Sequence, residues 1–304
     1  MTKVYDMIII GGGSAGYTAA LYAARAGMEV VVLEKMFAGG QMTETMKIEN
    51  YPGFKEIAGF DLGMKMQEGA ERFGVETQFA EVLKVDLVPE IKIIETTAGE
   101  YQGRTVVIAM GAGHKTLGVA NEAELTGRGV AYCATCDGMF YRGKNVAIVG
   151  GGNTAAADAL HLANIVDKVT LIHRRDTLKA TKIYHEPLMQ AENIDIMWNS
   201  QVDELIFDEK LSGIKVKNIE TGGITELAVE GLFVSVGRTP ATKLFEGQLE
   251  LDEQGYIIAD ESTRTNIPGV YAVGDIRTKA LRQVITAASD GAVATHYAEE
   301  YLMK

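Results

Sequence analysis

The sequence has few cysteines, a deficit of positive charge and no long apolar segment. Its 304 residues contain only two cysteines, which excludes a scaffold held together by several disulfides. Lysine and arginine number 29 against 41 aspartate and glutamate residues, so the net charge is −12. This balance argues against a protein that binds a nucleic-acid backbone, which needs clustered positive charge.

Features of membrane insertion and export are also missing. No apolar run approaches the roughly 18–20 residues that span a bilayer. Near the N-terminus, Asp6 precedes only four apolar residues, whereas a signal peptide has a longer apolar stretch and a cleavage site. We therefore expect a soluble, cytoplasmic protein with no membrane or nucleic-acid partner. The length and an ordinary globular composition suggest two domains.

An internal repeat organises the chain. The glycine-rich segment Gly11–Gly16 recurs as Gly150–Ala155, 139 residues later, and the similarity extends beyond the glycines. In each copy an apolar stretch precedes the glycines, and an alanine-rich stretch and a second apolar stretch follow. Expected strands are residues 7–10, 30–33, 146–149 and 169–172. Strand, glycine turn, helix and strand form a βαβ unit with parallel strands. The sequence therefore predicts an α/β fold with two Rossmann-like nucleotide-binding domains.

The first glycine motif carries an acidic partner. Gly11 would allow the tight turn, Gly13 the approach of a pyrophosphate, and Gly16 the packing of the helix on the strand. The helix start offers unpaired N–H groups to the phosphates. Glu34 ends the second strand, 18 residues after Gly16, where a carboxylate can accept bonds from both ribose hydroxyls. The alternative is a simple glycine turn with a surface glutamate, but the combination favours a dinucleotide with free ribose hydroxyls, such as FAD.

The second glycine motif carries a basic partner. His173 takes the place of Glu34, and Arg174 and Arg175 follow it. A guanidinium can bind a ribose 2′-phosphate through two charge-assisted hydrogen bonds, whereas a carboxylate would repel it. The alternative is a solvated basic patch at a strand end. We predict that this copy binds NADPH.

The two cysteines, Cys133 and Cys136, form a C-x-x-C pair. Such a pair can be half of a zinc site, a structural disulfide or a redox dithiol. Zinc requires four ligands, and neither a second cysteine pair nor suitably spaced histidines are present. A reducing cytosol disfavours a structural disulfide that closes so small a loop, so the redox dithiol is favoured. Asp137, next in the chain, could move a proton to or from a thiolate, or could cap a helix.

Strand-like segments continue at 232–236 and 270–273, and a helix is expected from about Leu281 to Leu302. No low-complexity linker separates the repeats. Any hinges must therefore be short ordered segments, which we expect near Gly118–Asn121 and Gly237–Ala241.

Several motifs occur in a specific order over essentially the whole chain. They are Gly11–Gly16, Gly39–Gln41, Glu49–Phe54, Cys133–Asp137, Gly150–Ala155, His173–Arg175, Gly274–Asp275 and Arg282–Val284. In this order they resemble the low-molecular-weight thioredoxin reductases of the bacterial type. The resemblance implies two three-layer ββα domains, the second inserted into the first. The FAD domain would comprise residues 1–117 and 243–304 and the NADPH domain residues 118–242, in a homodimer.

The resemblance also implies site residues. Those implied or predicted to contact FAD are Gly11, Gly13, Ser14, Ala15, Gly16, Glu34, Gly40, Gln41, Asn50, Asp275, Arg282, Gln283 and Val284. Those for NADPH are Gly150, Gly152, Asn153, Thr154, His173, Arg174, Arg175 and Lys179. By the same resemblance, Cys136 would face the flavin, Cys133 would attack the partner disulfide and Asp137 would be the acid–base residue. The sequence departs from the family pattern at several positions that bear on NADPH: lysine replaces arginine at 179, Ala157 stands where glutamate is common, and Asp158 replaces the next glutamate.

The implied activity passes electrons from NADPH through FAD and the Cys133–Cys136 pair to the disulfide of thioredoxin. The family rotates the inserted domain so that the dithiol can leave the flavin. Two alternatives keep the dithiol: reduced ferredoxin as the electron donor, or another small redox protein as the acceptor. A third is a flavin-binding sensor in which the cysteine pair is a switch without turnover.

Overall fold

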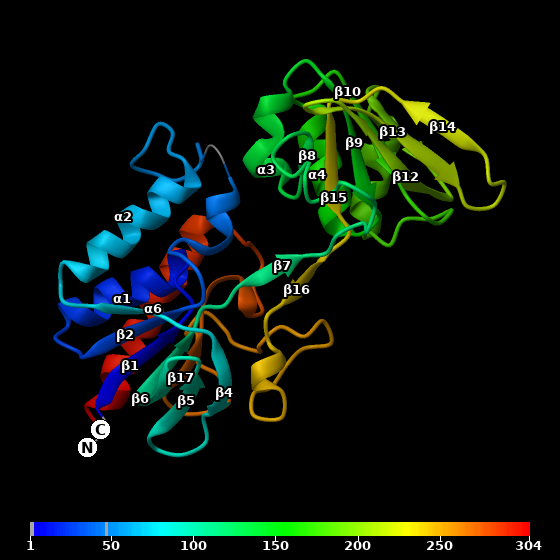
Figure 1. Ribbon diagram of the computed structural model, residues 1–304. Helices are drawn as coiled ribbons and strands as arrows, with labels where there is room; N and C mark the ends of the chain where they lie inside the picture. The colour runs from blue at the N-terminus through cyan, green and yellow to red at the C-terminus, as the bar shows by residue number, and fades with distance from the viewer. Residues whose placement is uncertain (1–2, 46–47) are drawn as a thin grey trace. The chain divides into compact units, whose positions relative to one another are not determined.

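The computed structural model describes residues 3–45 and 48–304, which divide into two compact units (Figure 1). The first unit contains the chain up to Gly113 together with Thr239–Lys304, and the second is His114–Arg238. The second unit is thus inserted into the sequence of the first. Both boundaries lie four residues before the expected positions, 118 and 242.

The first unit is built on a mainly parallel sheet. Its parallel strands, in spatial order, are β3 (Glu76–Phe79), β2 (Val30–Glu34), β1 (Val4–Ile10), β6 (Gly99–Ile108) and β17 (Val270–Ala272). The first half of β6 also pairs with the antiparallel strand β5 (Lys92–Thr96), and β5 pairs on its other edge with the antiparallel strand β4 (Val82–Asp86). The longer helices are α1 (Ser14–Arg25), α2 (Gly59–Glu71) and α6 (Val284–Leu302).

Successive side chains of β1 point to opposite faces of the sheet, and this explains the three layers. Met7 and Ile9 pack in one core cluster with the alanines of α1 and α6, whereas Ile8 and Ile10 pack in another with residues of β4 and β5. A strand covered on both faces has no polar side, so it is a continuous apolar run. The result is a helix layer, a parallel sheet and an antiparallel layer. Close packing of α6 on α1 requires Gly291, because a Cβ there would collide with the carbonyl oxygen of Ala15.

The second unit repeats this design. Its parallel strands, in spatial order, are β11 (Ile194–Met197), β10 (Lys168–Ile172), β9 (Asn145–Gly150), β15 (Gly231–Ser235) and β8 (Val130–Ala131). The antiparallel layer is β12 (Ser200–Phe207), β13 (Leu211–Asn218) and β14 (Ile224–Leu227), and the helices are α3 (Ala134–Asp137), α4 (Asn153–Ala163) and α5 (His185–Gln190). Val146 and Ile148 of β9 pack with α4, and Ala147 and Val149 pack with the antiparallel layer. The predicted pair of three-layer α/β units is confirmed.

Short 3-10 helices complete the fold at Gly40–Glu44, Gly138–Tyr141, Lys182–Tyr184, Lys243–Phe245 and Gly274–Ile276. The last helix begins at Val284 rather than Leu281, because Gln283 caps it: Thr286 Oγ1 accepts a hydrogen bond from the Gln283 N–H at 3.1 Å. Within the described ranges, none of the helices combines the length and apolar content needed to cross a membrane.

The chain passes between the units at β7 (Ala112–His114) and β16 (Arg238–Pro240), which pair with each other. The expected connection at 237–241 coincides with β16. The other, at 118–121, is wrong, because that segment lies inside the second unit. The Glu122 carboxylate holds it by accepting hydrogen bonds from the N–H groups of Leu117 and Gly118, both at 2.9 Å.

Candidate functional site

The loop between β1 and α1 is shaped by two glycines. Gly11 has a φ of +106°, and a Cβ there would lie 2.6 Å from the carbonyl oxygen of Ala109. A Cβ at Gly16 would collide with the carbonyl oxygen of Gly11. Gly13 is open, since a Cβ there would have no other atom nearer than 3.9 Å, and no side chain caps α1. The N–H groups of the first turn, from Ser14 and Ala15 onward, therefore face a loop that can admit a phosphate.

Glu34 is held against this loop from the end of β2. Its Oε2 accepts a hydrogen bond from the Gly12 N–H at 2.6 Å, and its Oε1 accepts one from the Met36 N–H at 3.1 Å. Two backbone donors thus fix the carboxylate beside the glycines. This is the position from which an acidic side chain meets a ribose in a dinucleotide-binding βαβ unit.

A second glycine pair meets the same loop. The Gly39 N–H donates to the carbonyl oxygen of Gly12 at 2.7 Å, and both Gly39 and Gly40 have positive φ. The amide of Gln41 donates from Nε2 to the carbonyl oxygen of Ala112 at 2.5 Å. Gly40 therefore lies against Gly13 of the predicted dinucleotide loop, and contact of Gly40 and Gln41 with FAD stays a prediction.

The C-terminal motifs of the first unit lie around one turn. Arg282 donates from Nε to the carbonyl oxygen of Asp275 at 3.4 Å and from Nη2 to that of Arg277 at 3.2 Å. Its guanidinium also lies 4.0 Å from the ring centroid of Tyr256. In this structure Arg282 supports the turn that carries Asp275. Contact of either residue with FAD stays a prediction.

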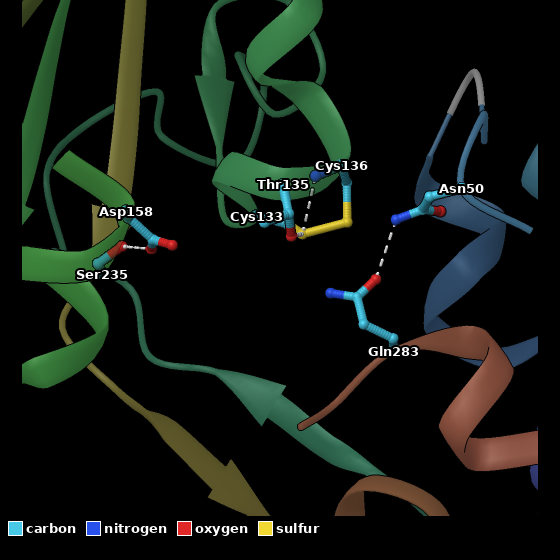
Figure 2. Close-up of a disulfide and its surroundings, with 7 residues drawn as sticks. All are labelled: Asn50, Cys133, Thr135, Cys136, Asp158, Ser235 and Gln283. Carbon is cyan, nitrogen blue, oxygen red and sulfur yellow. Dashed lines mark hydrogen bonds between the residues drawn. A yellow bond between two sulfur atoms is a disulfide. The ribbon is translucent and has the colours of Figure 1, made fainter. Parts of the chain in front are cut away.

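The start of α6 is tied to Asn50, a residue distant in sequence. Asn50 Nδ2 donates to Gln283 Oε1 at 3.1 Å, as Figure 2 shows. Val284 packs against an apolar cluster around Met42 and Leu62. The structure thus brings together motifs separated by 233 residues.

Sequence reasoning missed one feature of this unit. Asp290, on the buried face of α6, forms a buried ionic cluster with Arg277 and Lys279. A signal was present: Asp290 lies between Ala287 and Ala294 at helical spacing, where a charge is rarely buried without a partner.

In the second unit, the segment after β10 is fastened to the second glycine loop. The carbonyl oxygen of Gly151 accepts hydrogen bonds from the N–H groups of Lys179 and Ala180, at 2.7 and 2.9 Å. Asn153 Oδ1 accepts one from the Thr181 N–H at 2.7 Å. A Cβ at Gly150 would lie 2.5 Å from the carbonyl oxygen of Ser235. These hydrogen bonds therefore hold the second glycine loop and the segment after β10 together.

The basic residues differ in exposure. Arg174, Arg175 and Lys179 are exposed, and so are Asn153 and Thr154 at the start of α4; Gly152 has open space beside it. The His173 ring is buried, bonded through Nε2 to the carbonyl oxygen of Thr177 at 2.9 Å, and a Cβ at Gly151 would collide with it. His173 therefore supports the loop, while the exposed cations are the groups available to a phosphate.

Cys133 and Cys136 form a disulfide at the start of α3 (Figure 2). The Cys136 N–H donates to Cys133 Sγ at 3.2 Å, and Thr135 Oγ1 lies 3.4 Å from the same sulfur. Buried Ala134 anchors this helix in the core beneath α4. Among residues 3–45 and 48–304, no group of three or more histidine, cysteine, aspartate or glutamate side chains is arranged to hold a metal ion.

Asp137 is the last residue of α3. Its side chain makes no capping hydrogen bond, so the helix-cap interpretation does not describe it. Burial raises the pKa of its carboxyl to about 6. A group with this pKa can exchange a proton close to neutral pH, which suits an acid–base role beside a dithiol.

Comparison with known proteins places these features in a family. The pyridine nucleotide-disulphide oxidoreductase family matches residues 5–291. A thioredoxin reductase of Listeria monocytogenes is 44% identical over 301 residues, covering 99% of this chain and 94% of that protein. One from Streptomyces coelicolor is 45% identical over 306 residues, covering 99% and 95%.

A solved structure is similar to this chain over its whole length. The crystal structure of thioredoxin reductase from Streptococcus pyogenes has a TM-score of 0.93 at 42% identity, and covers 100% of this chain and 99% of that one. The matched length includes both glycine loops and the cysteine pair. The chain belongs to the pyridine nucleotide-disulphide oxidoreductase family and, within it, to the thioredoxin reductases.

Proposed function

We propose that this chain is an NADPH-dependent reductase that passes electrons through FAD and the Cys133–Cys136 pair to the disulfide of thioredoxin. One observation carries the proposal: a single chain combines a disulfide in a C-x-x-C pair with two glycine loops whose ribose-side residues have opposite charge. An acid at one loop and bases at the other suit two different dinucleotides.

The first unit fits FAD. Its open loop and uncapped helix suit a pyrophosphate, and the fixed Glu34 carboxylate suits free ribose hydroxyls while repelling a 2′-phosphate. The first unit also carries the polar side chains that the resemblance assigns to the flavin, those of Gln41, Asn50, Asp275 and Gln283. A bound flavin would supply two-electron transfer between a nicotinamide and the disulfide.

The second unit fits NADPH. Arg174 and Arg175 are exposed beside the second loop, where planar guanidinium groups can bind a phosphate through paired hydrogen bonds. Lys179 adds a third positive charge, as a point charge without that paired geometry. We therefore propose that the 2′-phosphate is recognised mainly by the two arginines.

The dithiol chemistry follows from the cysteine pair. Two electrons break the Cys133–Cys136 bond and leave one thiolate and, after protonation, one thiol. Cys133 Sγ then attacks the thioredoxin disulfide and forms a mixed disulfide. Cys136 Sγ attacks Cys133 Sγ, which releases thioredoxin as a dithiol and restores the internal disulfide. The Cys136 N–H, directed at Cys133 Sγ, stabilises a thiolate there.

Replacing Asp137 with asparagine is expected to slow the dithiol steps about 10²-fold while leaving flavin reduction by NADPH unchanged. The pKa of about 6 means that the carboxyl is protonated below this pH and can accept a thiol proton above it. The rate at which the reduced enzyme reduces thioredoxin should therefore rise with pH through about 6, and this rise should be lost in the variant. Stopped-flow mixing at several pH values measures it. An unaltered pH profile would contradict the acid–base role.

The proposed function is tested by steady-state turnover of the FAD-loaded protein. NADPH oxidation is measured with oxidised thioredoxin and, separately, with an oxidised glutaredoxin, and reduced ferredoxin is tried as the alternative donor. We expect turnover with NADPH and thioredoxin. Turnover with reduced ferredoxin but not with NADPH would support the ferredoxin-dependent alternative. Turnover with glutaredoxin but not with thioredoxin would show that the acceptor is another small redox protein.

Two features of the assembly complete the proposal. We propose a cytoplasmic homodimer, which light scattering during gel filtration would detect as twice the mass of the chain. We also propose that β7 and β16 act as the hinge about which the inserted unit rotates. The support is the resemblance for the dimer, and the two short connecting strands for the hinge.

A further inference from the structure

Asp290 is a buried carboxylate that none of the proposed catalytic steps uses. It is 6% exposed and lies on the inner face of α6. Its Oδ2 accepts hydrogen bonds from the Gly274 N–H at 2.8 Å, from Arg277 Nε at 2.9 Å and from Lys279 Nζ at 2.8 Å. Its Oδ1 accepts one from Arg277 Nη2 at 2.8 Å. Four donors on three residues thus converge on one side chain.

These contacts connect two parts of the predicted flavin site. Gly274 immediately precedes Asp275, so the Asp290 carboxylate fixes the backbone of that turn. Lys279 Nζ also donates to the carbonyl oxygen of Thr286 in the first turn of α6, at 3.2 Å. The cluster therefore holds the Asp275 turn and the α6 N-terminus, where Gln283 and Val284 lie, in one arrangement.

The cluster of Asp290, Arg277 and Lys279 contains more positive than negative charge. The side chains of Arg277 and Lys279 are 2% and 5% exposed, so two buried cationic groups share one anion. Glu261 lies 3.9 Å from Arg277 Nη2, but its side chain is almost fully exposed and solvent weakens its effect. Burial alone would raise the pKa of Asp290, yet the hydrogen bonds from Arg277 and Lys279 outweigh it and lower the pKa. Asp290 is therefore ionised at neutral pH, and one positive charge remains in excess.

We propose that Asp290 is a positioning residue for the flavin: with Arg277 and Lys279 it fixes the turn that carries Asp275, and the charge of this cluster sets part of the flavin's redox potential. The proposal rests on the proposed function, since it assumes that the first unit binds FAD. Reduction adds negative charge to a flavin, so a nearby excess of positive charge favours the reduced form.

Two variants and a matched control test this. Asp290→Asn removes the anion but keeps the shape, and Lys279→Met removes one cation but leaves the Asp290–Arg277 pair. Thr295→Val is the control, because Thr295 is also buried on α6 but donates to the carbonyl oxygens of Ala19 and Gly291, away from the turn. For each purified variant, the FAD dissociation constant, the flavin midpoint potential and the melting temperature of the apoprotein are measured.

Asp290→Asn is expected to raise the FAD dissociation constant at least about tenfold, because it weakens charge-assisted hydrogen bonds to the turn. Its flavin potential should become more positive, and that of Lys279→Met more negative. Thr295→Val should lower the melting temperature without either effect. Loosened packing would not produce shifts of opposite sign, so this pair separates positioning and charge from a merely structural role.

The proposal is overturned if Asp290→Asn holds FAD as tightly as Thr295→Val, or if the potentials of Asp290→Asn and Lys279→Met move in the same direction or not at all. If Asp290→Asn yields no folded protein, Lys279→Met decides alone: a lower potential supports the proposal and an unchanged one overturns it. Failure of the proposed function would show first in the unmodified protein, as absence of FAD binding or of reduction by NADPH. The two failures are therefore distinguishable.

Discussion

Changing Cys136 to serine is expected to abolish reduction of thioredoxin, lowering turnover more than about 10³-fold, while FAD stays bound and NADPH still reduces it. The variant cannot form the Cys133–Cys136 disulfide, so electrons on the flavin have no internal acceptor. The residues predicted to bind FAD all lie in the other unit and should be unaffected.

This prediction is checked with two assays on the same preparation. Anaerobic stopped-flow absorbance follows flavin reduction by NADPH, and NADPH oxidation with thioredoxin follows turnover. Normal flavin reduction serves as the internal control for folding. Retained thioredoxin turnover would refute the role of Cys136. Loss of both activities, together with loss of bound FAD, would mean that serine had damaged the fold rather than the relay.

Replacing Arg174 and Arg175 together with alanine is expected to raise the Michaelis constant for NADPH about 10²-fold and to leave that for NADH within about twofold. Each charge-assisted hydrogen bond contributes roughly 1.5–3 kcal/mol, and about 1.4 kcal/mol corresponds to a factor of ten. Both side chains are exposed beside the second loop, so their removal should cost little stability.

A matched control is Lys168→Ala. Lys168 is an exposed cation at the opposite end of β10, paired with Asp195 at 2.7 Å. The substitution Lys168→Ala changes the net charge of the second unit without altering the second glycine loop. Its Michaelis constants for both nucleotides should stay close to those of the unmodified protein. Equal effects of the arginine variant on NADPH and NADH would contradict recognition of the 2′-phosphate.

Much of the fold could be predicted because the βαβ units are local. Glycines at fixed spacing between an apolar run and an alanine-rich stretch place strand, turn and helix within about 25 residues. The same run in β1 does not reveal which layer covers each face. That Met7 faces helices and Ile8 faces β4 and β5 depends on strands far away in the chain. The three-layer arrangement is accordingly implied only by the family resemblance.

In the candidate site, too, local features could be predicted from the sequence and long-range packing could not. Glu34 ends β2, and Arg174 and Arg175 come two and three residues after the end of β10, so their register could be predicted from the repeat. His173 shares that register, but its ring turns inward onto Gly151, a packing detail that register cannot show. The hinge expected at 118–121 was misplaced because Glu122 fastens that segment to the second unit. Asp290 was missed because its partners gather only when the turn after β17 packs on α6.

NADPH is expected to give its electrons to a flavin bound by this chain. The most direct test is an anaerobic titration of the purified, FAD-loaded protein with NADPH and, in parallel, with NADH, followed by the visible absorbance of the flavin. We expect rapid bleaching by NADPH and much slower bleaching by NADH. A flavin that stays oxidised with both nucleotides, and is bleached by reduced ferredoxin, would contradict electron transfer from NADPH.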